Sequence, residues 1–274
     1  MTDRILDNLN LAVTLKPMIG LGASQPCAWQ AVASASRGRS FSAAAAALQP
    51  EQRVSLEARR ITLAIERAVA AGLLNSDALL AVPIGSASGK AEMLLSHLFR
   101  SALLHRFPTG RLVVEVSADE RGDRESAAAL IAACHARGLS VTLDAFAAGP
   151  VALNLLARFT PRFVKLDASL VRRIDASASR RPIVEGVMRL ARGMGVTVVA
   201  TGVETRGELE ALAALGVSHI QGDWTAEPVT RPLTNPALLR REPRATVPQH
   251  RRLAHHNRIA IAPRPAYQAA QLAL

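Results

Sequence analysis

The chain has 274 residues, enough to bury a full core as one barrel-sized domain or as two small domains. Its hydrophobic content is 49%, yet no uninterrupted apolar run approaches the roughly 20 residues that a membrane span needs, so no membrane association is expected. Residues 1–10 carry Asp3, Arg4 and Asp7 and lack the basic-then-apolar order of a secretory signal, which predicts a cytoplasmic protein.

Charge is unevenly distributed along the chain. The formal net charge is +11, and the eight Arg and one Glu from Arg231 onward account for +7 of it. Such arginine-rich usage, with only three lysines in the whole chain, is more typical of a base-composition bias than of a nucleic-acid site. Residues 231–264 also contain no Phe, Trp or Tyr ring on which a base could stack, so nucleic-acid binding through this tail is not expected. Cys27 and Cys134 form no metal-type spacing and are interpreted as reduced thiols.

The first half of the chain alternates predicted strands and helices. In the clearest helix, one apolar stripe faces the core, and Arg59, Arg60 and Arg67 are expected to face away from it. The expected elements are a strand at 12–19, a short apolar piece at 27–34, a loop with a short helix over 34–50, a helix at 51–71, a strand at 78–84 and a helix at 90–105.

The second half organises the chain. Its expected strands are 112–117, 140–144, 163–167, 196–201 and 219–221, with amphipathic helices between them. In the helix before the fourth of these strands, the predicted buried stripe is Ile183, Val187, Leu190 and Met194, and in the 205–215 helix it is Leu209, Leu212 and Ala213. Seven or eight strands with intervening helices predict an α/β fold with a parallel sheet closed into a TIM-like (β/α)8 barrel.

Each strand of the second half delivers a polar residue at or near its C-terminal end. In a barrel these ends converge on one mouth, where chemistry is normally found. Carboxylates, a lysine and an amide meeting there would suit Mg2+ and a phosphate group. The residues concerned are Glu115, Asp144, Lys165 with Asp167, Thr201 followed by Glu204, and Gln221.

Regularity declines after Pro228. We expect a barrel domain over 1–230 and an Arg- and Pro-rich, irregular and mobile tail over 231–274, with short helices at 235–241 and 266–274. His255 and His256 have no partner at ligand spacing and are interpreted as solvated.

Several segments carry a family resemblance in their order and spacing. VTLDAFAAG, FVKLDASLVRRID, VVATGVETRGELEALAALGV and HIQGDWTAEPV resemble the EAL-domain family of cyclic-di-GMP phosphodiesterases. LVVEVSADE, LAVPIGSAS and LKPMIGL with CAWQAVAS resemble the family's earlier segments more weakly, so the resemblance covers roughly residues 13–229. It implies a modified (β/α)8 barrel whose mouth binds two divalent metals and hydrolyses one phosphodiester bond of cyclic-di-GMP.

The resemblance assigns roles to individual positions. It matches retained residues to metal ligands (Glu115, Asp144, Gln221), to the catalytic lysine (Lys165) and to the second glutamate of the Glu-Gly-Val-Glu motif (Glu204). At other positions the family's functional residue is replaced. These are Gln30 for the name-giving glutamate, Ser34 for a phosphate-binding arginine, Pro83 for an asparagine, Ala118 for a glutamate, Ala145 for an aspartate and Thr201 for a glutamate.

The replacements predict loss of hydrolysis, because two-metal catalysis needs carboxylates that bridge the ions. Glu115, Asp144 and Lys165 could at most hold one Mg2+ weakly, so no cofactor is expected. The favoured interpretation of Asp144 and Lys165 is a buried ion pair that survives because removing one partner would leave the other unpaired.

Four functions follow from this interpretation. The preferred one is a catalytically inactive, EAL-like regulatory module that binds another protein in motility, biofilm or transcription control, through an apolar patch away from the mouth. The alternatives are a cyclic-di-GMP receptor that does not cut its ligand, which the loss of the phosphate-binding arginine disfavours, a weak residual phosphodiesterase, and nucleic-acid binding through the tail. The resemblance also implies that two copies can pair as a homodimer.

Overall fold

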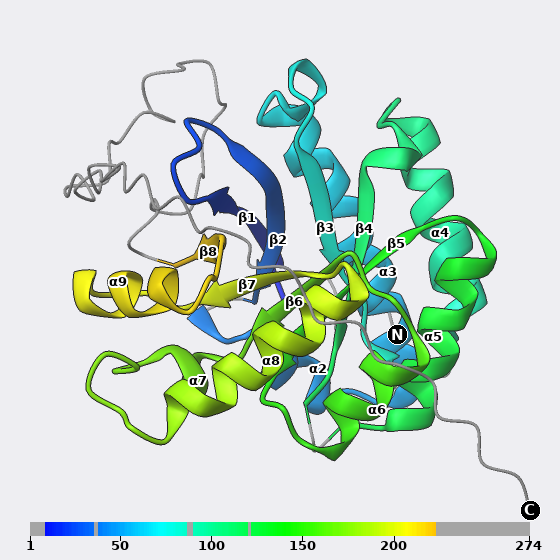
Figure 1. The fold of residues 1–274 in the computed structure, drawn as a ribbon. Coiled ribbons are helices and arrows are strands. Elements are labelled where there is room, and N and C mark those ends of the chain that lie inside the picture. The colour runs from blue at the N-terminus through cyan, green and yellow to red at the C-terminus, as the bar shows by residue number, and fades with distance from the viewer. Residues whose placement is uncertain (1–8, 36–37, 87–89, 120–121, 223–274) are drawn as a thin grey trace, which may run out of the picture. The chain divides into compact units, whose positions relative to one another are not determined.

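The computed structural model describes residues 9–35, 38–86, 90–119 and 122–222. Eight strands form a closed barrel in chain order, with the helices around its outside (Figure 1). The predicted α/β barrel is therefore confirmed. The tail and its two expected helices, at 235–241 and 266–274, lie outside the described residues, as do His255 and His256.

The barrel begins with an antiparallel hairpin and continues with parallel strands. β1 (Ala12–Gly20) is antiparallel to β2 (Pro26–Ser34) and also to β8, and the pairs from β2 to β8 are parallel. The apolar piece expected at 27–34 is thus strand β2. The remaining strands are β3 (Leu79–Pro83), β4 (Leu112–Ser117), β5 (Ser140–Phe146), β6 (Phe163–Leu166), β7 (Thr197–Thr201) and β8 (His219–Gln221).

The helices follow the strands as the sequence predicts, and local signals fix several of their ends. Pro50 opens one helix at the position that tolerates a missing N–H, and the Asp123 side chain caps another. The helices are α2 (Phe41–Ala46), α3 (Pro50–Ala70), α4 (Ala91–Leu104), α5 (Arg124–Ala136), α6 (Pro150–Arg158), α7 (Ala168–Val171), α8 (Arg180–Met194) and α9 (Arg206–Ala214), with short 3-10 turns at Leu73–Asn75 and Thr109–Arg111. None of the helices in the described ranges is long and apolar enough to cross a membrane.

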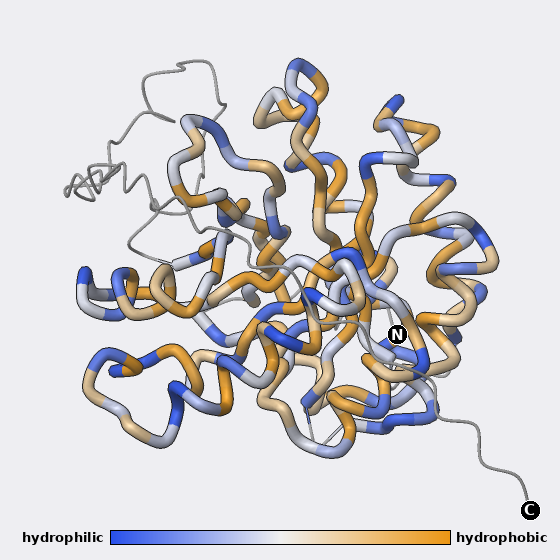
Figure 2. Tube along the Cα trace, viewed as in Figure 1, coloured by the Kyte–Doolittle hydropathy of each residue, from blue (hydrophilic) through white to orange (hydrophobic). Residues whose placement is uncertain are grey.

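Two apolar layers surround the strands. The main core lies between the strands and the helices, and Figure 2 shows hydrophobic residues along the central strands. A smaller cluster belongs to one face of the strands, and its members are Met18, Ala28, Leu79, Val113, Phe163 and Val199. Successive side chains of a strand point to opposite faces, so the residue two positions further along points the same way, one layer higher. This relation positions the polar residues of the mouth.

Three predictions about buried faces are wrong. In α8, Ile183 and Leu190 are 43% and 42% exposed, and the buried face is Val184, Val187, Met188 and Ala191. The predicted and observed stripes share Val187 and lie on adjacent faces of the helix, so the predicted direction of the buried face was off by about one position. In α9, Ala213 is exposed, because the buried face continues from Leu209 and Leu212 toward Glu208.

Arg60 is the third of these. Instead of facing solvent it is 8% exposed, forms a buried ion pair with Glu57 and stacks 3.9 Å over the Phe41 ring. The ion pair and the aromatic ring together offset the cost of burying the guanidinium. The apolar pattern of the helix alone had predicted this side chain in solvent. Its Nε has no hydrogen-bond partner among the described residues.

Candidate functional site at the barrel mouth

A polar layer lies directly above the small apolar layer. Moving two residues toward the mouth converts Ala28 to Gln30, Val113 to Glu115 and Phe163 to Lys165. Glu115 and Lys165 are 2% and 1% exposed, so this layer is inside the protein rather than at a solvated rim. Strand alternation alone therefore brings three sequence-predicted positions, from β2, β4 and β6, to one level of the barrel.

Short polar contacts join four side chains, here called the mouth cluster: Gln30, Glu115, Lys165 and Asp144. Gln30 Nε2 donates to Glu115 Oε2 at 2.6 Å, and Lys165 Nζ donates to Glu115 Oε1 at 3.0 Å. Lys165 Nζ also lies 3.3 Å from Asp144 Oδ1. Each oxygen of Glu115 thus has its own donor, and the ammonium bridges two carboxylates.

The predicted Asp144–Lys165 ion pair exists, but the prediction left out Glu115 as a partner of Lys165. Glu115 is the closer and more deeply buried partner of Lys165, whereas the Asp144 side chain is 36% exposed. The strand register explains the difference, because Glu115 is paired with Thr142 and Ser117 with Asp144. Asp144 is therefore one layer nearer the opening than Glu115, and the long lysine side chain spans both layers.

Electrostatics keep the ammonium charged in this buried place. Burial alone would lower the pKa of Lys165, but Glu115 and Asp144 outweigh burial and hold the pKa above its ordinary value. Burial and the neighbouring Asp144 carboxylate hold the pKa of Glu115 above its ordinary value, although Lys165 and Gln30 offset part of that rise. The mouth cluster thus contains its own counter-cation.

Other sequence-predicted residues do not join the mouth cluster. Gln221 is buried, and its amide contacts the Lys16 carbonyl at 3.5 Å. The Thr201 hydroxyl donates to the Leu166 carbonyl at 2.5 Å. Glu204, the supposed vestigial catalytic residue, is half exposed and pairs with Arg172 at 3.0 Å. Asp167 lies just beyond β6 and caps α7 through a 2.8 Å bond from Ser169 N.

The replaced positions offer little to a ligand. Ala118 is buried beside the end of β4, Pro83 is half-buried at the end of β3, and Ala145 follows Asp144 with an apolar side chain. Ser34 is half-buried at the end of β2, close to Ser40 across an isolated bridge. None of these positions carries a positive charge or a carboxylate toward the mouth.

The residues present do not fit a pair of divalent metals. Two ions need bridging carboxylates, and here the single ammonium of Lys165 is shared between Glu115 and Asp144, which leaves one net negative charge for any ion. Gln30 donates an N–H to Glu115 instead of supplying a negative oxygen. Over the ranges that the structure describes, no three His, Cys, Asp or Glu side chains gather in a way that could hold a metal ion.

One buried polar residue was missed by sequence reasoning. Thr142 is fully buried, and its hydroxyl has no hydrogen-bond partner in the described part of the chain. It lies opposite Glu115 in the β4–β5 register. Its position two residues before Asp144, on the same face of the strand, was the signal that could have found it.

The end of β5 and the loop after it carry backbone strain at two alanines. Ala145 and Ala148 have φ of 54° and 60°, a region that costs an L-residue about 1–2 kcal/mol. Ala145→Gly should therefore raise the free energy of unfolding by about 0.5–1 kcal/mol in urea denaturation, after the entropy cost of glycine is deducted. Ala147→Gly is the matched control, because Ala147 lies between them without a positive φ, and it should be neutral or destabilising. Equal effects of the two changes would contradict the strain.

Comparisons with known proteins agree on one family. The EAL domain family model matches residues 4–228. The probable cyclic di-GMP phosphodiesterase PdeN of Escherichia coli K12 is 31% identical over 144 residues, which are 53% of this chain and 27% of PdeN. The blue light- and temperature-regulated antirepressor BluF of the same organism is 30% identical over 137 residues, which are 50% of this chain and 33% of BluF. The chain thus spans a third or less of the length of these two relatives.

A solved structure extends the match to three dimensions. The manganese and cyclic-di-GMP complex of Klebsiella pneumoniae BlrP1 is similar with a TM-score of 0.71 and 26% identity, over 80% of this chain and 56% of that one. The barrel with its antiparallel first strand, the order of the motif segments and the extent of the family match lead to one conclusion. The chain belongs to the EAL-domain family.

Proposed function

We propose that this EAL-family chain does not hydrolyse cyclic-di-GMP and acts as a regulatory module that binds another protein. The observation that carries the proposal is the mouth cluster, in which Lys165 contacts Glu115 at 3.0 Å and Asp144 at 3.3 Å. One ammonium is shared by the two remaining carboxylates, and Gln30, Ala118 and Ala145 supply no further carboxylate, which leaves no pair of ions to activate water and stabilise the leaving oxygen. The cluster then acts as an internal support of the barrel.

Two further observations favour binding of a protein. BluF is similar to half of this chain and is named an antirepressor, so the name of this relative describes regulation rather than hydrolysis. In this chain, Leu103 and Leu104 are 80% and 76% exposed at the end of α4, the end opposite the mouth. Neighbouring exposed leucines are the apolar surface that a protein-binding role requires.

Turnover is the decisive measurement. The purified chain, incubated with cyclic-di-GMP and Mg2+ or Mn2+, should release linear dinucleotide no faster than a buffer blank in chromatography, while an active EAL phosphodiesterase converts the substrate in parallel. Metal-dependent turnover that disappears in Glu115→Gln would contradict the proposal, because it would show that this carboxylate still holds an ion.

Calorimetric titration separates the second candidate, a receptor that binds cyclic-di-GMP without cutting it. The BlrP1 complex contains this nucleotide, which favours testing it here. Ser34 in place of an arginine weakens the case, because two phosphate charges need partners. If cyclic-di-GMP still gives binding heat in the presence of EDTA, the leading proposal would be replaced by a regulator that responds to this nucleotide. If no heat appears at high micromolar cyclic-di-GMP, the receptor function is excluded and protein binding remains the proposed function.

A partner captured by the chain needs a matched control. The Leu103→Ser/Leu104→Ser double variant should lose the partner, since both leucines are exposed and their replacement leaves the core intact. Retention of the partner by this variant would place its contact elsewhere on the barrel.

A further inference from the structure

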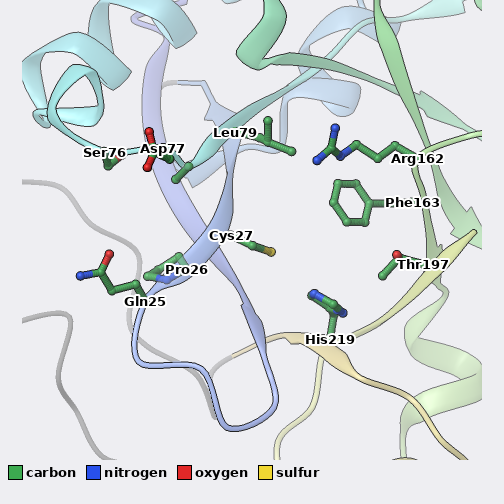
Figure 3. Close-up of a pocket in the computed structure, with 11 residues that line it drawn as sticks. Gln25, Pro26, Cys27, Ser76, Asp77, Leu79, Arg162, Phe163, Thr197 and His219 are labelled. Carbon is green, nitrogen blue, oxygen red and sulfur yellow. The ribbon is translucent and has the colours of Figure 1, made fainter.

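A cavity of about 440 Å³ lies at the N-terminal end of the barrel, opposite the mouth (Figure 3). Its lining comes from the starts of strands that are far apart in sequence, including Cys27 of β2, Leu79 of β3, Phe163 of β6 and His219 of β8. The EAL motif residues contribute nothing to it, because they belong to the other ends of the same strands.

The floor of this cavity is apolar. Leu79 and Phe163 are 8% and 6% exposed and belong to the small apolar layer beneath the mouth cluster, with Cys27 packed against it. This layer separates the cavity from Glu115 and Lys165. The floor therefore offers an aromatic ring and an aliphatic side chain to the uncharged part of a ligand.

The rim carries an uncommitted positive charge. Arg162 is exposed, and no ion pair or hydrogen bond of its guanidinium is found in the described part of the chain; it lies 5.7 Å from the Phe163 ring, and its charge also acts on the Cys27 thiol. In Figure 3 the Arg162 side chain extends along the same side of the cavity as Phe163, with Thr197 and His219 further along. A guanidinium with free donors above an apolar floor is suited to a carboxylate or a phosphate.

The remaining polar groups limit the charge of the ligand. Burial lowers the pKa of His219, so its ring is neutral at neutral pH, and Nδ1 already bonds to the Ser218 hydroxyl at 2.9 Å. Asp77 lines the opposite side and repels a second negative group. The cavity therefore matches a compact molecule with one anionic end.

We propose that this cavity is a second binding site, for a small organic anion whose carboxylate or phosphate pairs with Arg162 while its apolar part covers Phe163 and Leu79. The site is independent of the proposed function, because it shares no residue with the mouth cluster. It gives the barrel a place where a small molecule can bind at the end remote from the EAL motifs.

Cys27 supplies a reporter for the test. Its thiol lines the cavity and is half-buried; burial raises the pKa of Cys27, and the charge of Arg162 partly offsets that rise. Cys134 is fully buried, and burial raises its pKa to about 12. The rate at which neutral iodoacetamide alkylates the full chain is measured with increasing benzoate or phenyl phosphate. We expect saturable protection with a Kd on the order of a millimolar, typical of ligands this small. Cys27→Ser should abolish the fast alkylation phase.

Variants and a neutral analogue decide the outcome. Arg162→Gln should weaken protection at least about five-fold, the loss of one charge-assisted contact, and Arg189→Gln, an exposed arginine of α8, should leave it unchanged. Ligand-observed NMR does not depend on the thiol, and it should rank the affinities of wild type, Arg162→Gln and Arg189→Gln in the same way. Equal protection by benzyl alcohol, or an unchanged Kd in a folded Arg162→Gln protein, would overturn the anion site, and no protection by either probe at tens of millimolar would overturn the site altogether.

Discussion

Replacing Lys165 by methionine should lower the free energy of unfolding by about 3–5 kcal/mol, the loss typical of breaking a buried ion pair from one side. The ammonium is 1% exposed and satisfies both Glu115 and Asp144. Methionine fills a similar volume, so the loss would come from a buried Glu115 carboxylate whose only remaining donor is Gln30. Urea denaturation at neutral pH measures the difference.

Two controls accompany this variant. Lys90→Met removes an exposed ammonium and should change stability by less than about 1 kcal/mol. The Lys165→Met/Glu115→Gln double variant should lose clearly less free energy of unfolding than the two single variants together, because position 115 then carries no charge that needs a partner. If Lys165→Met cost no more than Lys90→Met, the mouth cluster would not be the internal support proposed above.

Glu208→Ala should be the second largest change, with a loss of about 2–4 kcal/mol. Glu208 is 3% exposed, and its two oxygens accept from three backbone N–H groups, those of Arg173 at 2.8 Å, Glu204 at 2.9 Å and Thr205 at 3.1 Å. It also completes the capping box of α9. Alanine would leave two N–H donors unpaired at the start of α9 and a third, that of Arg173, unpaired just after α7.

The pH dependence of this variant identifies the cause. Burial alone would raise the pKa of Glu208, but the backbone N–H bonds outweigh it and hold the pKa below its ordinary value of 4.5. A lowered folded-state pKa contributes stability that is present above pH 4.5 and is lost as the pH falls through the folded-state pKa. The gap between wild type and Glu208→Ala should therefore narrow at acid pH.

Glu210→Ala gives the matched control for Glu208. Glu210 lies two residues further along α9, and its exposed pair with Arg206 is worth at most about 0.5 kcal/mol. An equal loss from Glu208→Ala and Glu210→Ala would contradict the role assigned to the buried carboxylate.

Much of the fold could be predicted because periodicity and strand ends are local properties. The alternation of apolar strands and amphipathic helices gave the barrel, and the polar residue at each strand end gave Glu115, Asp144 and Lys165 as members of one site. Which carboxylate lies closest to the lysine depends on the offset between neighbouring strands. That offset is a property of the closed barrel and is not encoded in either strand alone.

The errors share a physical origin. Ile183 and Arg60 were misplaced because a helical stripe fixes only the approximate direction of the buried face. Arg60 is buried because the Phe41 ring of α2 lies over its guanidinium, and no spacing rule links Phe41 to a residue of the next helix. Its ion-pair partner Glu57, three residues earlier on α3, was the only local signal. The cavity around Arg162 and Phe163 could not be foreseen either, since its lining comes from strand starts that converge only in the closed ring.

The seam between β1 and β8 has a consequence for how the protein is made. Within residues 9–222 these strands pair at Ile19 with Ile220 and Gly20 with His219, and Leu21 N donates to the Ser218 carbonyl at 2.8 Å. The contact from Gln221 to Lys16 joins residues 205 positions apart. During synthesis, β1 therefore waits with one edge bare until almost the whole barrel has left the ribosome. The ring closes last at its shortest junction, and slow translation of the final strand would lengthen the time in which that edge can pair with another chain.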